Sequence, residues 1–574
     1  MAVEWTKEQR QVIELRNRNI LVSAAAGSGK TAVLVERIIK RITDEQHPVD
    51  VDRLLVVTFT NAAASEMRER IGDAIEAALE REPENHHLQR QQSLIHNAQI
   101  TTIDSFCLYI VRNYFHTIDL EPGFRIADEG ELALLKEQVL DEVLESFYEK
   151  SNEDFTSFME AFATAKSDRN VRSMILELFT TAQSNPWQSE WLDKLDEDYK
   201  KACESPDDSV WMQLALSDYR NSMEDVLREL QKAWNLTQEF DGPQMYAGAI
   251  KSDLELVETL CTKDTYADIV QALTELPAYA RLAAARGYDG SLQKQAQVKA
   301  AREQMKDTIQ KLREKIFFQS QSDLKASLCR QQPMVHVLLE LVRAFTEAYD
   351  KAKRKKSLVD FSDIEHFALD ILVNAKTKEP TPVAEEFRNF FEEVMIDEYQ
   401  DSNYLQEAIL SAVSKIQSGE PNMFMVGDVK QSIYRFRLAR PELFMEKYET
   451  YTKEDSPYQK IELHKNFRSR EGVLAAVNDI FYKIMGKDLG RVHYDEDAAL
   501  YPGADYPVLK GEQESSEVIV VEQDSSTERS ILEAGTIGRK IRQLKENGWI
   551  TDKKSGELRR PGYSDMVILL RSPG

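Results

Sequence analysis

A glycine-bearing turn near the amino terminus ends in a lysine and a threonine. It follows an apolar run and opens a helical pattern, and its residues are Ala24, Ala25, Ala26, Gly27, Ser28, Gly29, Lys30 and Thr31. Glycines let backbone N–H groups close around phosphate oxygens, and the lysine would reach the β and γ phosphates. The Thr31 hydroxyl would bind Mg²⁺. The turn predicts a phosphate-binding loop for ATP, although the strict pattern begins with glycine where this chain has Ala24.

Two adjacent acids, Asp397 and Glu398, follow a second apolar run. A carboxylate at the first of these positions would hold Mg²⁺ through water. Glu398 would orient and deprotonate the attacking water, because phosphoryl transfer depends mainly on positioning and charge stabilisation. An acidic pair is weak evidence alone, but together with the phosphate-binding loop it predicts hydrolysis of a nucleoside triphosphate.

Aromatic and basic residues alternate in the segment from Tyr434 to Arg437, with Phe436 as the second aromatic. Aromatic faces with interleaved cations suit the bases of single-stranded DNA, where stacking contributes ~1–3 kcal/mol per base. The alternative for both aromatics is a place in a buried core. Thr60 and Asn61 stand at the start of a helical pattern, where hydroxyl and N–H groups suit phosphates. The alternative there is an ordinary capped helix.

Four short apolar runs must position these motifs, and each suits a buried parallel strand. Every run ends in a polar or glycine-bearing turn followed by a helical pattern, and ligands bind at the carboxyl ends of such strands. We therefore expect an α/β fold with a parallel sheet. The runs are Asn19 to Ser23, Arg53 to Phe59, Glu393 to Ile396 and Met423 to Val426.

A long helical block interrupts this alternation. No glycine occurs between Gly130 and Gly242, and apolar residues recur there at spacings of three and four. Similar composition continues to about Lys356, which predicts an inserted helical domain. The basic run from Lys351 to Lys356 suits either a solvated helix end or a DNA-facing patch. The polar, turn-rich interval from about Tyr501 to Arg560 receives no assigned chemistry.

Composition sets further limits. With 574 residues, several domains are expected, and no apolar run approaches the ~20 residues of a membrane span. The first residues lack a secretory pattern, so we expect a soluble, cytoplasmic protein without membrane contact. The formal charge of −25 requires that any DNA contact come from local chemistry. The cysteines form no C-x-x-C pair, which argues against zinc and disulfides: Cys107, Cys203, Cys261 and Cys329.

Two of these motifs resemble those of the UvrD/RecB-like superfamily-one DNA helicases. They are residues 397–401, Asp-Glu-Tyr-Gln-Asp, and residues 427–437, which begin Gly-Asp-Val-Lys-Gln. Residues 124–129 and 492–497 look like the AddA branch of that group, the helicase-nuclease subunits of bacterial AddAB. The resemblance implies RecA-like P-loop motor lobes. It assigns 1–125 and 357–440 to the first lobe, 126–356 to the helical insertion, and 441–574 to the start of an incomplete second lobe.

The resemblance also implies roles for residues at matching positions. Gln9 would read adenine, Gln431 would sense the γ phosphate, and Arg468 would be an arginine finger. Phe467 would stack on the adenine. At the helix start with Thr60 and Asn61, the resemblance favours contact with DNA phosphates over ordinary capping. The residues that it implies for DNA binding are Thr60, Asn61, Thr102, Tyr434 and Phe436. Asp104 stands where many relatives have histidine.

The function that the resemblance implies is ATP- and Mg²⁺-dependent translocation on single-stranded DNA, with unwinding from duplex ends and 3′ to 5′ polarity. The setting implied is double-strand-break repair and homologous recombination, in a heterodimer with an AddB-like subunit. The AddA resemblance also implies a nuclease domain beyond Gly574. Residues 564–572 resemble a strand motif that precedes a second insertion in relatives, so we expect the chain to end at a fragment boundary. The alternatives are a UvrD-like repair helicase without a nuclease and a non-motor ATP-dependent DNA clamp.

Overall fold

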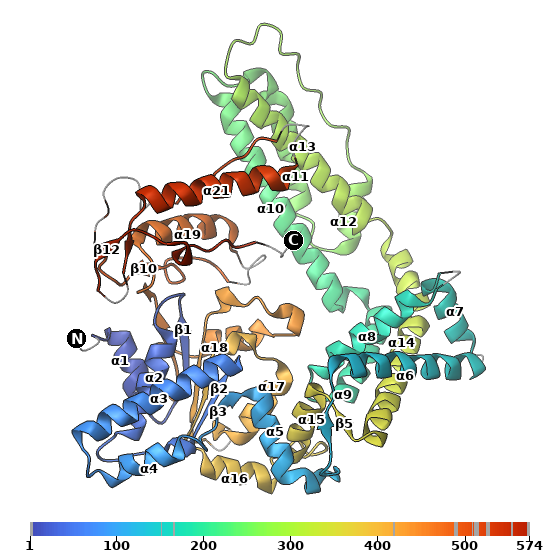
Figure 1. The fold of residues 1–574 in the computed structure, drawn as a ribbon. Helices are drawn as coiled ribbons and strands as arrows, with labels where there is room; N and C mark the ends of the chain where they lie inside the picture. The colour runs from blue at the N-terminus through green and yellow to red at the C-terminus, as the bar shows by residue number, and fades with distance from the viewer. Residues whose placement is uncertain are drawn as a thin grey trace. The chain divides into compact units, whose positions relative to one another are not determined.

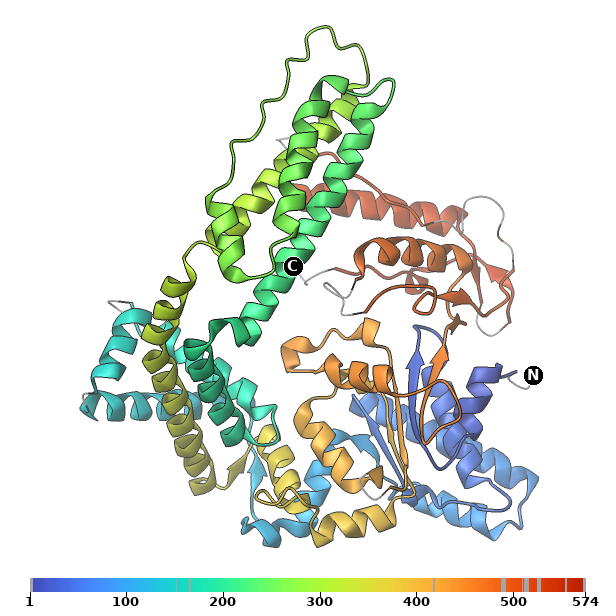
Figure 2. The same cartoon turned by 180° about the vertical axis from the view of Figure 1, so that it is seen from behind.

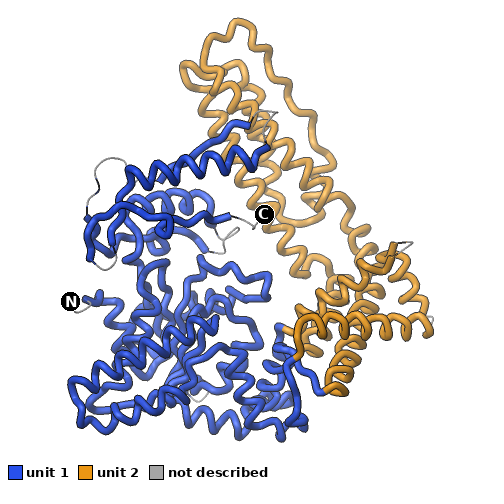
Figure 3. The backbone as a smooth tube through the Cα atoms, in the orientation of Figure 1, with its two compact units in different colours: residues 1–126, 184–186, 357–574 blue, residues 127–183, 187–356 orange. Residues whose placement is uncertain are grey.

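The computed structural model describes residues 4–150, 152–164, 167–416, 419–486, 492–507, 509, 516–523, 528–552 and 555–570. The chain forms two compact units, which Figure 3 distinguishes by colour. The first unit comprises residues 1–126, 184–186 and 357–574, and the second comprises 127–183 and 187–356. The second unit therefore spans nearly the range expected for the inserted domain.

A six-stranded parallel sheet organises the first unit, with strand order β3-β2-β6-β7-β1-β8. The four apolar runs expected to be strands all belong to it, which confirms the α/β fold class. Register is set by central pairs such as Ile20 with Phe424 and Val56 with Met395. The strands are β1 Asn19–Ala24, β2 Leu54–Thr58, β3 Ile100–Thr102, β6 Glu393–Ile396, β7 Met423–Gly427 and β8 Tyr458–Leu463.

The edge strand β8 pairs with β1 along its whole length, from Asn19 opposite Tyr458 to Ala24 opposite Leu463. The first sheet therefore continues past residue 440, where the first lobe was expected to end. The polar residues of β8 break the apolar pattern that marked the other strands, because an edge strand is less fully buried. We propose that the second lobe begins after Leu463.

Helices pack beside this sheet (Figure 1). One group shares a core with alternate strand residues, including Ile20, Val22 and Val56. This group is α1 Lys7–Glu14, α2 Lys30–Ile42, α3 Asn61–Arg81 and α4 His86–Leu94. A second group packs its helices on one another: α5 Ile103–Tyr114, α15 Phe361–Leu372, α16 Pro382–Phe390 and α17 Tyr404–Val413. The helix α18 Pro441–Thr450 precedes β8.

The second unit is built from helices, as the glycine-free composition predicted (Figure 2). Two separate apolar clusters hold it, one containing Phe345 and Tyr349 and the other containing Tyr219 and Phe317. Its helices are α6 Glu129–Lys150, α7 Glu153–Phe162, α8 Arg169–Gln183, α9 Gln188–Glu204, α10 Val210–Gln238, α11 Ala247–Cys261, α12 Tyr266–Thr274, α13 Leu292–Lys315 and α14 Gln321–Lys355. In the sequence, the second unit lies between the paired strands β4 Arg125–Ile126 and β5 Leu358–Val359 of the first unit.

One residue of the basic run at the end of α14 fits neither expected role. Lys353 is 2% exposed, its ammonium lies 4.3 Å from the centre of the Tyr349 ring, and it pairs with Asp350. The aliphatic part and the ammonium group of Lys353 therefore both make contacts inside the second unit. Cysteine burial also varies: Cys107 and Cys203 are buried, whereas Cys329 is exposed.

The carboxyl-terminal part of the first unit contains α19 Glu471–Ile484 and α21 Arg529–Asn547. It also contains two short strand pairs, β9 Lys465–Asn466 with β10 Tyr501–Pro502 and β11 Ile550–Thr551 with β12 Leu558–Arg559. The expectation of a turn-rich interval from Tyr501 to Arg560 was wrong for α21. Gly535 and Gly538, together with many polar residues, concealed its helical pattern.

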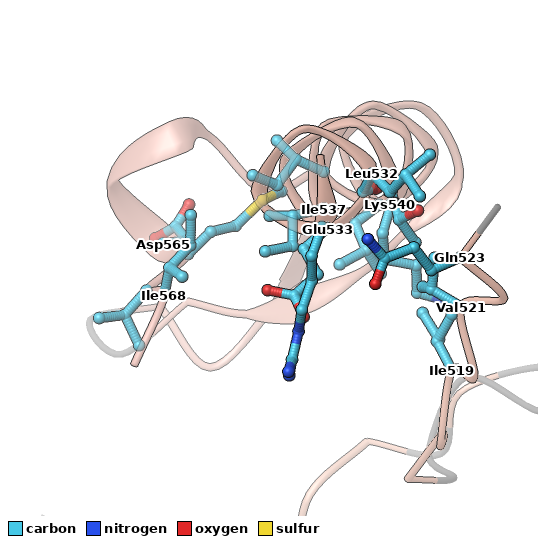
Figure 4. Close-up of a pocket in the computed structure, with 15 residues that line it drawn as sticks. Ile519, Val521, Gln523, Leu532, Glu533, Ile537, Lys540, Asp565 and Ile568 are labelled. Atoms are coloured by element: carbon cyan, nitrogen blue, oxygen red, sulfur yellow. Dashed lines mark hydrogen bonds and ion pairs between the residues drawn. The ribbon is translucent and has the colours of Figure 1, made fainter. Parts of the chain in front are cut away.

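An apolar pocket of about 890 Å³ lies along α21. Figure 4 shows Ile568 to one side of the helix and Ile519 and Val521 to the other. Residues 566–570, part of the expected strand motif, form no strand pairing in the described part of the chain, whereas Arg571, Ser572 and Gly574 lie outside it. None of the helices described here is both long and apolar enough to cross a membrane.

A buried ion pair ties α2 to the start of β6. The Arg37 side chain is 1% exposed, and its Nε donates to Glu393 Oε1 at 2.9 Å. Burial lowers the pKa of Arg37, and Glu393 opposes that change. A carboxylate is therefore needed at this position, because an unpaired guanidinium in the core would keep its desolvation penalty.

We expect Glu393→Ala to lower the free energy of unfolding by about 3–5 kcal/mol, because Arg37 would remain buried without its carboxylate. Denaturant titration followed by circular dichroism measures this loss. The adjacent, exposed Glu392 provides the control: Glu392→Ala should change stability little. Equal stability losses for the two variants would contradict a structural role for the Arg37–Glu393 pair.

Candidate nucleotide site and DNA track

The phosphate-binding loop joins β1 to α2, as its pattern predicted. Gly27 and Gly29 have φ angles of 70° and 84°, which other residues adopt only with strain. At Gly27 an added Cβ would lie 2.6 Å from Asn466 Nδ2, so space as well as conformation requires glycine. Lys30 is the first residue of α2, and the unpaired N–H groups of this helix terminus suit an anion.

The structure brings the loop lysine to the acidic pair. Lys30 Nζ donates to Glu398 Oε2 at 2.8 Å and to Oε1 at 3.1 Å, although the two residues are 368 positions apart. Glu398 has a φ of 52°, an uncommon backbone conformation that costs of order 1–3 kcal/mol. Such strain is typical of functional sites, and here it follows the end of β6 directly.

Burial shifts the protonation of the neighbouring carboxyls. It raises the pKa of Asp397 to about 6, with a further contribution from Glu398 that Lys30 opposes. Burial also raises the pKa of Asp401 to about 6. A divalent cation would favour the ionised forms, and carboxylate and hydroxyl oxygens are ligands that Mg²⁺ prefers. The donor set of Asp397 and Thr31 therefore fits Mg²⁺.

Two of the residues expected at the nucleotide lie against the loop. Gln9 is 5% exposed, and its Nε2 donates to the Ser28 carbonyl at 3.1 Å. The backbone N–H of Phe467 donates to the Gly27 carbonyl at 2.9 Å. Asn466 adds a contact that the sequence did not assign, since its Nδ2 donates to the Ala26 carbonyl at 2.7 Å.

The side chains of two other residues expected at the nucleotide make no hydrogen bond to the phosphate-binding loop among the described residues. Arg468 is exposed, and among the described residues no carboxylate pairs with its guanidinium. Gln431 Nε2 donates to Asp428 Oδ2 at 2.7 Å. Asp428 also pairs with Lys430 at 3.0 Å, so the γ-phosphate sensor expected from the sequence is held by a neighbouring carboxylate.

The two helix starts expected to contact DNA are both capped, and the cap at Thr60 was predicted from its polar residues. Thr60 is the N-cap of α3, where its side chain accepts from the Ala63 N–H, and Asn61 is exposed beside it. Thr102 is the N-cap of α5 and accepts from the Ser105 N–H. These helices begin after β2 and β3, so both N-termini lie at the carboxyl edge of the same sheet.

The two aromatics of the alternating segment differ in burial. Phe436 is 76% exposed, so the alternative that it belongs to a buried core is wrong. Tyr434 is half-buried. The Tyr434 ring lies 4.6 Å from Phe59 and 5.9 Å from Phe436, between centroids. Arg437 lies 5.4 Å from the Tyr434 centroid. Phe59 was not predicted as a site residue, although its position directly before Thr60 was a usable signal.

A pocket of about 230 Å³ connects the acidic site with this aromatic segment. Three acids of the segment after β6 line it: Asp397, Glu398 and Asp401. Its lining also includes residues from the segments expected to contact DNA and from their neighbours: Phe59, Thr102, Asp104, Tyr434 and Arg437. Two residues expected at the nucleotide, Asp397 and Glu398, therefore share this pocket with two expected at DNA, Thr102 and Tyr434.

Asp104, in the wall of this pocket, pairs with a buried acid. The Asp104 carboxyl hydrogen-bonds to Glu365 of α15, and Gln406 Nε2 donates to Glu365 Oε1 at 2.8 Å. Burial, together with the charge of Asp104, raises the pKa of Glu365 to about 8. This shift favours the protonated form of Glu365, which can then share a hydrogen bond with the Asp104 carboxyl.

A glycine-bearing loop between strand and helix, and an acidic pair at the same edge of one parallel sheet, define a P-loop nucleotide-binding protein. Comparison with known families makes the class specific. The family described as the UvrD/REP helicase N-terminal domain matches residues 5–452, and the chain belongs to this family.

Curated relatives extend the similarity along 99% of the chain. An ATP-dependent helicase/nuclease subunit of Lachnoclostridium phytofermentans is 45% identical, and the match covers 44% of that protein. The equally named proteins of Bacillus cytotoxicus and Bacillus cereus (strain AH187) are each 42% identical, with 47% of each covered. The resemblance to this group is confirmed. The chain spans less than half the length of these relatives.

The buried acid pair predicts a dependence of stability on pH. The pKa of Glu365 is higher in the folded state than its ordinary value of 4.5, so its contribution to stability is fully present below 4.5 and is lost as pH rises towards 8. We expect Glu365→Gln to reduce the fall in melting temperature between pH 5.5 and 8.5, as measured by differential scanning calorimetry. An unchanged pH profile would show that Glu365 is already ionised in the folded protein.

Proposed function

We propose that this chain carries the ATP-hydrolysing motor of a DNA helicase that translocates 3′ to 5′ on single-stranded DNA and unwinds from duplex ends. The contact between Lys30 and Glu398 carries the proposal, because it joins the phosphate-binding loop to the water-orienting acid. The exposed Phe436 and half-buried Tyr434 supply the DNA track in the same unit.

The chain's own residues would divide the work of hydrolysis. Lys30 would exchange the Glu398 carboxylate for the β and γ phosphates, which leaves Glu398 free to orient and deprotonate water. Gln9 would hold the adenine and Phe467 would stack on it, while Gln431 and Arg468 would turn towards the γ phosphate. Asp397 and Thr31 would hold Mg²⁺, which neutralises phosphate charge when bound.

The biological setting is part of the same proposal. The relatives are named as helicase/nuclease subunits, which supports a helicase-nuclease over a repair helicase without a nuclease. We propose a cytoplasmic heterodimer with an AddB-like partner, acting in double-strand-break repair and homologous recombination. The intact Glu398 supports a motor over a non-motor clamp, because a clamp needs no water-orienting acid.

Substitutions at the two contacting residues test the nucleotide site. Glu398→Gln should retain ATP binding and lose DNA-stimulated hydrolysis by at least about 100-fold, because only the water-activating carboxylate is removed. Lys30→Ala should impair both binding and turnover. Steady-state ATPase rates and binding of a fluorescent ATP analogue measure the two effects in the complete gene product. Normal turnover in Glu398→Gln would refute the assignment of Glu398.

A second test addresses the DNA track. Phe436→Ala should weaken binding of single-stranded DNA by ~1–3 kcal/mol, equal to about one stacked base, with little change in ATP affinity. Fluorescence anisotropy with oligonucleotides of different sequence measures the loss, which should be similar for all of them. Phe361→Ala, at an exposed phenylalanine at the start of α15, is the matched control and should leave DNA binding unchanged. Equal DNA affinity in the two variants would contradict the track.

A further inference from the structure

The buried amide of Gln400 lies between the acidic site and the segment that leads to the DNA track. Its side chain hydrogen-bonds in both directions although the residue is only 1% exposed. On one side, Nε2 donates to Glu398 Oε2 at 2.8 Å and, at 3.3 Å, to Asp401 Oδ2. On the other, Oε1 accepts from the backbone N–H of Asp428 at 3.0 Å. One amide therefore connects the water-orienting carboxylate with the residue that follows β7.

Gly427 provides independent support for this arrangement. A Cβ at this position would lie 2.2 Å from Gln400 Oε1 and 3.2 Å from the Phe444 ring, so any side chain would displace the amide. Gly427 has no left-handed φ that would otherwise require glycine. The need for glycine here is therefore explained by the close approach of Gln400.

Asp428 is the meeting point of two amides. Its backbone N–H is bound by Gln400, and its carboxylate accepts from Gln431 Nε2. The chain then passes through two short helical turns, Val429–Gln431 and Arg435–Arg437, the second of which contains Phe436. A displacement of this segment would therefore reach Glu398 through a single side chain.

We propose that Gln400 is a positioning residue that couples DNA occupancy to hydrolysis, an inference that rests on the proposed function. In the structure Glu398 Oε2 accepts from both Lys30 and Gln400, whereas Oε1 accepts from Lys30. When Lys30 moves to the phosphates, Oε1 becomes free to accept water, and Oε2 stays fixed by Gln400. DNA stacked on Tyr434 and Phe436 fixes the segment from Asp428, and this fixes the orientation of Glu398.

Gln400→Met tests the coupling, because it keeps the side-chain length and removes the hydrogen bonds to Glu398, Asp401 and Asp428. We expect the ATPase rate with single-stranded DNA to fall by about 10- to 100-fold, the effect of losing a hydrogen bond to a charged group. The rate without DNA should change less, so the stimulation by DNA should fall. The KM for ATP and the Kd for oligonucleotides should stay within about twofold. All assays use the complete gene product.

A second variant separates the two bonds and serves if Gln400→Met does not fold. Gln400→Glu keeps an oxygen that accepts from Asp428 N–H but loses the donor to Glu398, so it should lose DNA stimulation as well. The matched control is Gln91→Met. Gln91 is a fully buried amide that accepts from Val51 N–H and donates to Asp50, and its loss should lower the melting temperature without changing DNA stimulation.

The outcomes separate this inference from the proposed function. Undiminished stimulation by DNA in Gln400→Met and Gln400→Glu would overturn the coupling. A fall of equal size with and without DNA would also overturn it, because Gln400 would then position Glu398 without transmitting DNA binding. If the wild-type protein itself showed no DNA-stimulated ATPase, the proposed function would fail instead.

Discussion

The site depends on one geometric constraint, the convergence of the carboxyl ends of parallel strands at a single sheet edge. The phosphate-binding loop follows β1, the acidic pair follows β6, and the segment with Gln431 follows β7. Only β7 separates β1 from β6 in the sheet. The side chains of Lys30 and Glu398, which follow these two strands and are 368 positions apart, can therefore approach to 2.8 Å. The strands β4 and β5, which flank the helical insertion in the sequence, pair with each other, so the sheet keeps its order across the insertion.

Much of this arrangement could be predicted from the sequence, because buried strands and glycine turns leave strong local signals. Strand β6 was predicted with the bounds that the structure shows, and β1, β2 and β7 within a residue at each end. The capped starts at Thr60 and Thr102 could also be predicted, since hydroxyl N-caps depend on neighbouring residues only. These signals are local, and local signals can be recognised without knowledge of the fold.

What could not be predicted depends on contacts between distant segments. Strand β8 has polar residues because it lies at the sheet edge, so no apolar run marked it. The helix α21 contains two glycines that suggested turns. The sequence marks Gln400 only as one residue of the motif at 397–401. Its proposed role depends on the contacts of its amide nitrogen with Glu398 and of its amide oxygen with Asp428, which only the fold brings together. Gly427 gave a weak sign of this contact, but a glycine after a strand has several explanations.

The strong negative charge of the chain restricts how this unit can hold DNA. With a formal charge of −25, broad attraction to phosphate is absent, so affinity must come from neutral donors and from stacking. The N-termini of α3 and α5 offer N–H and hydroxyl groups, and Phe436 offers an exposed ring. Arg437 places its cation against the Tyr434 ring, where it would strengthen the proposed stacking of bases. Binding of this kind ignores base sequence and releases few counterions, so it suits a motor that must release and rebind the strand at every step.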